Sequence, residues 1–186
     1  MPKRSIRAQF LFERKSRPIE SCVDSSVKVQ QRFLHSSMFH GAERLALYSP
    51  IHNEVATDAV ALRAIALGKT LVYPRIKGDA LEFVKVVTLS DLTPGAFGVP
   101  EPRGSHLVAV EELDLIVVPG VVFDRIGHRL GYGRGFYDRA LSACRKDCLK
   151  VGFAYDTQLV ESLPATEHDK TLSVLLTESQ RLNFSA

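Results

Sequence analysis

The chain has 186 residues, of which 45% are hydrophobic and 24% are charged, and it carries a formal net charge of +3. This length and composition favour one globular domain over residues 1–186, and the mild positive charge excludes a histone-like binder of nucleic acid. The three cysteines lack disulfide-framework spacing, and no apolar N-terminal segment resembles a signal peptide or a membrane span, so a reduced, cytoplasmic protein is expected.

The first half of the chain predicts two polar helices, followed by strands and a further helix. Residues 3–16 form a strongly basic segment that predicts a helix ending before Pro18. Further elements are expected, in chain order, as a helix over 27–39, a strand over 44–49, a helix over 54–67 capped by Asn53, and strands over 70–74 and 81–87. The glycine- and proline-rich residues 93–102 predict an irregular surface loop.

The second half is organised around a strand followed by a glycine-rich loop. Residues 113–119 are almost continuously apolar and rich in β-branched side chains, which predicts a strand buried on both faces. The loop over 120–135 then leads into an expected helix over 136–144, a strand over 149–155, a short helix over 158–162 and a strand over 172–177. Alternating strands and helices predict an α/β fold with a mainly parallel sheet covered by helices.

The sequence RLGYGRGFYDRA, residues 129–140, predicts a binding site for a polyanion. Its alternate glycines, Gly131, Gly133 and Gly135, let backbone N–H groups face an anion, and the following helix brings its positive end to the same place. Arg129 and Arg134 can add bidentate contacts to phosphate oxygens. The pattern matches neither the dinucleotide fingerprint nor the Walker A motif, so a plain glycine-rich turn stays open as the alternative.

The segment VVPGVVFDRIGHRLGYGRGFYDRAL, residues 117–141, resembles the signature of the 5-formyltetrahydrofolate cyclo-ligase family, also called methenyltetrahydrofolate synthetase. Three further segments agree in order and spacing, and they are KRSIR at 3–7, NEVATDAV with LVYPRI within 53–76, and LPATEHDKTLSVLLT at 163–177. The sequence departs from the family at Phe136, where tyrosine is usual, and at Arg134, where many members have glycine or lysine. Neither departure removes a charged group that the chemistry needs.

The resemblance implies a three-layer α/β/α fold similar to ribose-5-phosphate isomerase and the acyl-CoA transferases. It also implies a reaction in which 5-formyltetrahydrofolate and ATP give 5,10-methenyltetrahydrofolate, ADP and phosphate, with Mg²⁺ as cofactor. The γ-phosphoryl group would first move to the formyl oxygen. Phosphoryl transfer depends on positioning and charge stabilisation, so a Ser-His-Asp or Cys-His arrangement is not required.

The resemblance implies the site residues as well. The ATP site would comprise Lys3, Arg4, Arg7, Arg129, Leu130, Gly131, Tyr132, Gly133, Arg134, Gly135, Phe136 and Tyr137. The folate site would comprise Tyr48, Ser49, Glu54, Tyr132, Gly133, Arg134, Gly135 and Phe136. Arg134 and Glu54 would act in catalysis, and Asp138 and Asp169 would hold Mg²⁺.

From the residues alone, several of these side chains have plainer interpretations. The basic N-terminal helix can be a solvated face, Glu54 and Asp138 can complement a helix dipole, and Asp169 can be a loop acid. The aromatic residues that are either walls for the pterin ring or ordinary core residues are Phe123, Tyr132, Phe136 and Tyr155.

Two other functions stay open at this point. A sugar-phosphate isomerase or a CoA transferase could share the fold, and a non-catalytic homologue could use the loop and the basic helix to bind a nucleotide or RNA. The expected partners are 5-formyltetrahydrofolate and ATP, without nucleic acid or membrane, and the protein is expected to be a monomer.

Overall fold

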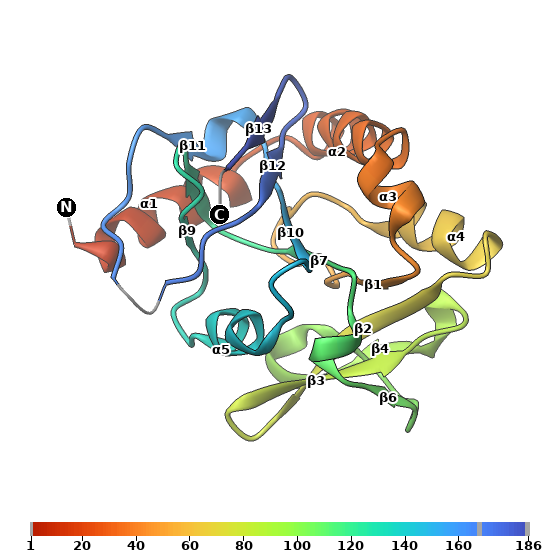
Figure 1. Ribbon diagram of the computed structural model, residues 1–186. Helices are drawn as coiled ribbons and strands as arrows, with labels where there is room; N and C mark the ends of the chain where they lie inside the picture. The colour runs from red at the N-terminus through yellow and green to blue at the C-terminus, as the bar shows by residue number, and fades with distance from the viewer. Residues whose placement is uncertain (1, 167–168, 185–186) are drawn as a thin grey trace.

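A large, mostly parallel sheet forms the centre of the protein (Figure 1), whose computed structural model describes residues 2–166 and 169–184. Its strands, in spatial order, are β13 (Arg181–Asn183), β12 (Val174–Leu176), β10 (Leu149–Phe153), β7 (Leu115–Val118), β1 (Arg44–Ala46), β2 (Thr70–Lys77), β3 (Ala80–Lys85) and β6 (Leu107–Val108). The five strands from β12 to β2 run parallel, and the outer strands β13, β3 and β6 pair antiparallel. The predicted α/β class with a mainly parallel sheet is confirmed.

Helices cover both faces of this sheet. They are α2 (Ile19–Leu34), α3 (Ser37–Gly41) and α4 (Asp58–Ala66) on one face and α5 (Phe136–Ala143) on the other. Helix α1 (Lys3–Lys15) packs elsewhere, through Ile6 and Phe10 against Val122, Leu130 and Leu163. Alternate residues of β7 face opposite sides, so Leu115 and Val117 join the core formed with α2, α3 and α4, while Ile116 and Val118 join the core formed with Leu141 of α5. The arrangement therefore has helix, sheet and helix layers, as Figure 1 shows.

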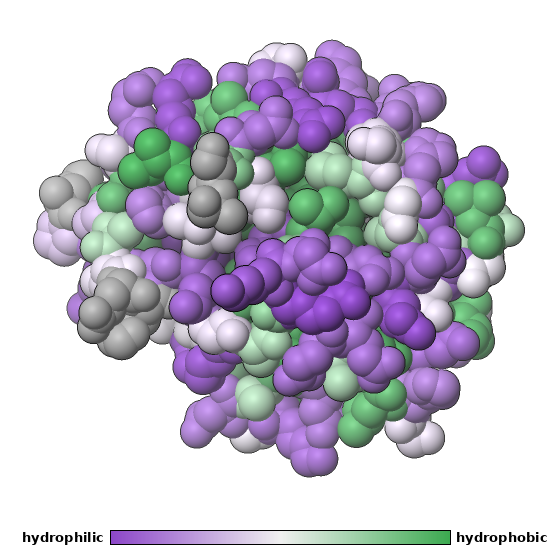
Figure 2. Space-filling model, viewed as in Figure 1, coloured by the Kyte–Doolittle hydropathy of each residue, from purple (hydrophilic) through white to green (hydrophobic). Residues whose placement is uncertain are grey.

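The outer surface is mixed in polarity. Figure 2 shows the same face as Figure 1, with hydrophobic residues in separate green patches among hydrophilic ones. Among the described residues, no helix combines the length and the apolar composition that a membrane crossing requires. The bulk of the hydrophobic side chains lies beneath the surface, in the two cores on either side of the sheet.

The helix predicted over 54–67 starts later than expected. Helix α4 begins at Asp58 with Thr57 as its N-cap, so Asn53 is not a cap for this helix and Glu54 does not begin it. His52 and Asn53 instead have left-handed backbone conformations, with φ of 50° and 59°. The Asn53 amide donates to the carbonyl of Arg14 at 3.2 Å, near the end of α1, so its side chain links this turn to α1 and does not cap α4.

Other differences come from short strands in segments predicted as loops or helix. Residues 93–102 are not wholly irregular, because β4 (Leu92–Pro94) pairs with β5 (Pro100–Pro102). A separate three-stranded sheet is formed by β8 (Val122–Asp124), β9 (Arg129–Leu130) and β11 (Leu159–Val160). The helix predicted over 158–162 is wrong, and α2 begins eight positions before the predicted start at 27. The remaining elements are short 3₁₀ turns, η1 (Leu89–Asp91), η2 (Ala96–Gly98), η3 (Val110–Glu112) and η4 (Asp156–Gln158).

Candidate functional site

A pocket of about 610 Å³ opens at the carboxyl ends of the neighbouring strands β1 and β7. Tyr48 and Ser49 follow β1, and Pro119 follows β7, so the pocket lies where open α/β sheets bind their ligands. Its volume falls in the range typical of sites for cofactor-sized molecules. Helix α1, the loop after β9 and the start of α5 provide its charged and glycine-rich walls.

The loop between β9 and α5 has backbone that only glycine adopts readily. Gly133 and Gly135 have φ of 96° and 69°, and Gly135 is the N-cap of α5. A Cβ atom on Gly133 would stand 3.2 Å from the guanidinium carbon of Arg7. The Arg7 Nε atom donates to the carbonyl oxygen of Gly131 at 2.6 Å. The glycines therefore allow a guanidinium of α1 to lie directly against the loop.

Two further cations beside this loop, Lys3 and Arg129, are paired with carboxylates. The Lys3 ammonium lies 2.5 Å from Asp169, and the buried Arg129 guanidinium lies 3.1 Å from Asp138. Burial lowers the pKa of Arg129, and the nearby Asp138 carboxylate opposes that change. Arg129 also donates to the carbonyl of Lys170 at 2.9 Å. Asp138 and Asp169 are thus held at one edge of the pocket by residues from three different segments.

The two aspartates fit a magnesium ion that keeps most of its shell for phosphate and water. Asp138 accepts hydrogen bonds through Oδ1 and Asp169 through Oδ2, and in the described part of the chain their other carboxylate oxygens accept none. Within residues 2–166 and 169–184, no cluster of three or more histidine, cysteine or acidic side chains forms a complete protein shell. Magnesium usually takes one or two carboxylates together with substrate phosphates, which matches this donor set.

Glu54 lies at the opposite wall, almost fully buried, with 8% of its surface exposed. Its Oε2 accepts from the Ile51 amide at 3.0 Å, and its Oε1 accepts from the Tyr132 hydroxyl at 3.2 Å and lies 3.5 Å from Arg14. Burial raises the pKa of Glu54 above its ordinary value, while the Arg14 charge and the two hydrogen bonds limit the rise. This wall therefore presents a desolvated carboxylate held by two hydrogen bonds and one ion pair.

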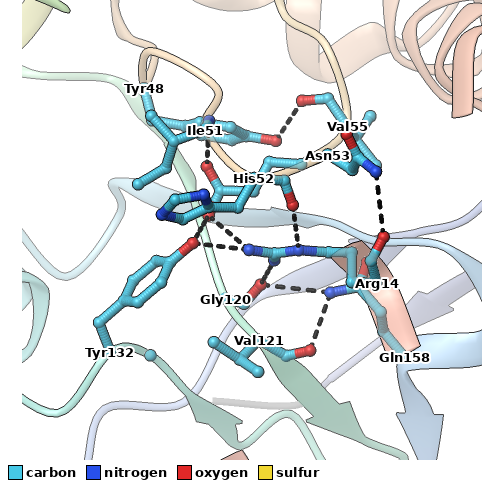
Figure 3. A network of polar contacts seen from close by, with 12 residues as sticks. Arg14, Tyr48, Ile51, His52, Asn53, Val55, Gly120, Val121, Tyr132 and Gln158 are labelled. Atoms are coloured by element: carbon cyan, nitrogen blue, oxygen red, sulfur yellow. Dashed lines mark hydrogen bonds and ion pairs between the residues drawn. The ribbon is translucent and has the colours of Figure 1, made fainter. Parts of the chain in front are cut away.

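Arg14 is the principal residue that sequence analysis missed. It is 3% exposed and contacts His52, Glu54, Gly120 and Tyr132, which lie in three loops. Figure 3 shows Arg14 beside His52, Gly120 and Tyr132. The spacing of Lys3, Arg7 and Arg14 puts all three on one face of a helix, and this was the available signal. The predicted set also omitted other pocket residues, namely Ile51, His52, Pro74, Ile76, Leu81, Phe97, Val99, Glu101 and Pro119.

The hydroxyl groups predicted for the folate site are already used within the protein. The Tyr48 hydroxyl donates to the Val55 carbonyl at 2.6 Å, and Ser49 donates to the Pro100 carbonyl at 2.7 Å. Both residues line the pocket while holding neighbouring loops in place. At the rim, the Arg134 guanidinium lies 4.0 Å from the centre of the Phe97 ring.

All the predicted site residues except Arg4 line this one pocket. Arg4 is exposed on α1, and its role in ATP binding stays a prediction. Leu130 packs its side chain in a small cluster with Val122 and Leu163, so its backbone is what it offers the pocket. Phe123 and Tyr155 are fully buried in the cores, so they are core residues and not pterin walls. Tyr132 and Phe136 do line the pocket.

Comparisons with known proteins point in one direction. Residues 1–178 match the model of the 5-formyltetrahydrofolate cyclo-ligase family. A probable 5-formyltetrahydrofolate cyclo-ligase of Caenorhabditis elegans is 31% identical over 84% of this chain and 82% of its own. The cyclo-ligase of Mycolicibacterium smegmatis is 29% identical over 94% of this chain and 93% of its own. The NMR structure of Aquifex aeolicus 5,10-methenyltetrahydrofolate synthetase superposes with a TM-score of 0.90 at 34% identity, covering 100% of this chain and 94% of that one.

Proposed function

The chain belongs to the 5-formyltetrahydrofolate cyclo-ligase family, and we propose that its pocket converts 5-formyltetrahydrofolate and ATP to 5,10-methenyltetrahydrofolate, ADP and phosphate. The observation that carries this proposal is the convergence in one pocket of a basic helix face, a glycine-rich loop, two available carboxylate oxygens and a buried glutamate. The first three suit a nucleotide with its metal, and the fourth suits a polar heterocycle.

The chemistry requires activation of a weak electrophile. The formyl group is an amide, and its oxygen would otherwise have to leave as hydroxide. Transfer of the γ-phosphoryl group to the formyl oxygen releases ADP and turns that oxygen into part of a phosphate leaving group. The neighbouring folate nitrogen then attacks the formyl carbon, the ring closes, the nitrogen loses its proton and phosphate departs. Such a transfer needs the two substrates to be aligned and their charges to be stabilised.

The nucleotide would lie against helix α1 and the glycine-rich loop. Backbone N–H groups of Gly131, Gly133 and Gly135 would face the phosphates, and Arg7, held against Gly133, would contact them through its Nη atoms. Arg134 at the rim would stabilise charge on the transferred group. Asp138 and Asp169 would hold Mg²⁺, which supplies charge neutralisation at the phosphate oxygens when bound.

The folate would occupy the wall formed by Tyr48, Ser49 and Glu54. Glu54 would contact the substrate near the formyl group, where an ionised carboxylate can accept a hydrogen bond and attract positive charge that develops as the ring closes. Tyr132 donates to Glu54 and lies on the nucleotide loop, so it would stand between the two substrates.

The direct test is to mix the protein with ATP, Mg²⁺ and 5-formyltetrahydrofolate and to follow the absorbance of the methenyl product. Formation of that product, with one ADP for each methenyl group, supports the proposal. Absence of product together with salt-sensitive RNA binding supports the non-catalytic homologue, and isomerisation of a sugar phosphate supports the other enzyme class.

We further propose that residues 1–186 act as a single domain and a monomer in the cytoplasm, without nucleic acid or membrane. Contacts between the ends of the chain support the single domain, because Lys3 pairs with Asp169 across 166 positions. The helix–sheet–helix layering also supports a likeness to ribose-5-phosphate isomerase and the acyl-CoA transferases. Light scattering of the purified protein tests the monomer.

A further inference from the structure

Arg14 joins both substrate sides of the pocket through a single buried guanidinium. Its Nε donates to the His52 carbonyl at 3.0 Å, and its Nη1 donates to the Gly120 carbonyl at 2.8 Å. Its Nη2 donates to the Tyr132 hydroxyl at 2.6 Å and lies 3.5 Å from Glu54. Figure 3 shows the guanidinium between the loop that carries His52 and the loop that carries Tyr132.

The position of the Glu54 carboxylate depends on contacts from other segments as well as on its own loop. It follows His52 and Asn53, which both have left-handed backbone conformations, and it precedes α4 by four positions. The left-handed conformation is unfavourable for His52, although asparagine tolerates it better, so contacts from outside the loop help to hold the turn. Arg14 supplies one such contact at the His52 carbonyl, and the Asn53 amide supplies another at the Arg14 carbonyl.

The same helix face carries the cations of the nucleotide side. Lys3, Arg7 and Arg14 are spaced by four and seven positions, and each turns its charged end toward the pocket or its walls. Lys3 pairs with Asp169 and Arg7 bonds to Gly131, both on the nucleotide side. One rigid helix therefore contacts both walls.

We propose that Arg14 is a positioning residue, which pairs with the Glu54 carboxylate and fixes it against Tyr132 so that the distance between the folate wall and the nucleotide loop stays constant. The inference rests on the proposed function. Arg14 does not line the pocket, so it acts through Glu54 and Tyr132 and does not touch the substrates.

The electrostatics of Glu54 agree with this role. The titratable or charged groups facing it are Arg14 from α1, Tyr132 from the glycine-rich loop, Tyr48 after β1 and Tyr137 from α5. Arg14 is the one cation in that set. Burial raises the pKa of Glu54 and Arg14 lowers it, so removal of Arg14 raises the pKa further and favours the neutral acid.

If Arg14 only stabilised the fold, its effect on activity would not depend on the charge of residue 54. The Gly120 carbonyl also accepts from the Gln158 amide at 3.3 Å, and Tyr132 also donates to Glu54. Both groups keep a partner when Arg14 is replaced, whereas the His52 carbonyl and the Glu54 carboxylate each lose their contact with Arg14. The loss at the His52 carbonyl is the same whether residue 54 is glutamate or glutamine, and the loss of the ion pair is not. A functional effect of Arg14 should then depend on whether residue 54 carries a charge.

A double-mutant cycle separates these roles. Arg14→Met, Glu54→Gln and the double variant are compared by kcat/KM for 5-formyltetrahydrofolate, with circular dichroism as the folding control. We expect Arg14→Met to lower kcat/KM at least tenfold in the wild-type background and less than threefold when Glu54→Gln is present. Arg17→Met is the matched control, because Arg17 pairs with Glu178 outside the pocket, and its effect should be the same in both backgrounds.

The pH profile gives a second readout. Activity that requires ionised Glu54 falls as pH falls through its pKa, and Arg14→Met should move this acid limb to higher pH, because the Arg14 charge lowers the pKa of Glu54. Arg14→Lys retains the positive charge without the planar fork, so its acid limb should stay near the wild-type position. If Arg14→Met does not fold, Arg14→Gln, which removes the charge but keeps hydrogen-bond donors, replaces it in both tests. The proposal is overturned if the effects of Arg14→Met and Glu54→Gln on kcat/KM simply multiply in the double variant and the acid limb of Arg14→Met does not move. Absence of methenyl product from the wild type overturns the proposed function instead.

Discussion

Replacing Arg7 with methionine tests the nucleotide side of the pocket most directly. The substitution keeps an apolar stem on α1 and removes the guanidinium that lies against Gly133. In the wild type, Nε donates to Gly131, and in the described part of the chain Nη1 and Nη2 donate no hydrogen bond, so they can reach a phosphate. One hydrogen bond involving a charged group contributes about 1.5–3 kcal/mol. At about 1.4 kcal/mol for each factor of ten, the Kd for ATP should rise roughly 10- to 150-fold.

Isothermal titration with ATP and Mg²⁺, without folate, measures this change. Lys28→Met is the matched control, because it removes one positive charge from the exposed surface of α2 and should leave the Kd unchanged. The melting temperature of Arg7→Met should stay within a few degrees of the wild type, since Ile6 and Phe10 keep α1 packed against Leu130. A folded Arg7→Met protein that binds ATP within threefold of the wild type would refute the assignment. Loss of salt-sensitive RNA binding in that variant would favour a nucleic-acid arm.

Four further outcomes are expected. Removal of divalent cations by a chelator should abolish product formation, and added Mg²⁺ should restore it, as a steady-state assay will show. Asp138→Asn should reduce activity steeply. It should also lower Tm by about 2–4 °C, because buried Arg129 loses the charge of its partner at a cost of about 1 kcal/mol. Full activity of this variant would mean that Asp138 only complements the dipole of α5. Glu54→Gln should raise the KM for folate more than the Kd for ATP, and equal changes in both would contradict its place on the folate wall. Gly133→Ala should weaken ATP binding, because φ is 96° and the new Cβ meets Arg7, and unchanged titration curves would count against this loop geometry.

Local patterns in the sequence were enough for the centre of the fold. The apolar run over 113–119 became β7, which is buried on both faces, and the alternate glycines before α5 became the pocket loop. These features depend on hydrophobicity and backbone freedom within a few neighbouring residues. The four segments that resemble the family, together with Tyr48 and Ser49 just before the second of them, supplied the remaining site residues, all but Arg4 of which line one pocket.

Conformations that depend on residues far away in the sequence could not be predicted from local patterns. Asn53 has the side chain of an N-cap, but its amide bonds to the end of α1, 39 positions away, and the helix begins at Asp58. Arg14 belongs to a segment whose charge suggests a solvated surface, yet its partners at Gly120 and Tyr132 lie more than 100 positions away. Tertiary contacts decided both conformations.

The long separations between α1 and its partners also bear on how the protein forms during synthesis. Lys3 bonds to Asp169 across 166 positions, Arg7 to Gly131 across 124, and Arg14 to Gly120 across 106. Contacts that close such long stretches of chain form slowly, and on the ribosome they must wait until the later partner has left the exit tunnel. Helix α1 is therefore made well before its partners and docks only after they have been made. A nascent chain that does not yet include Gly120, Gly131 and Asp169 exposes a cationic helix whose charged side chains lack these contacts.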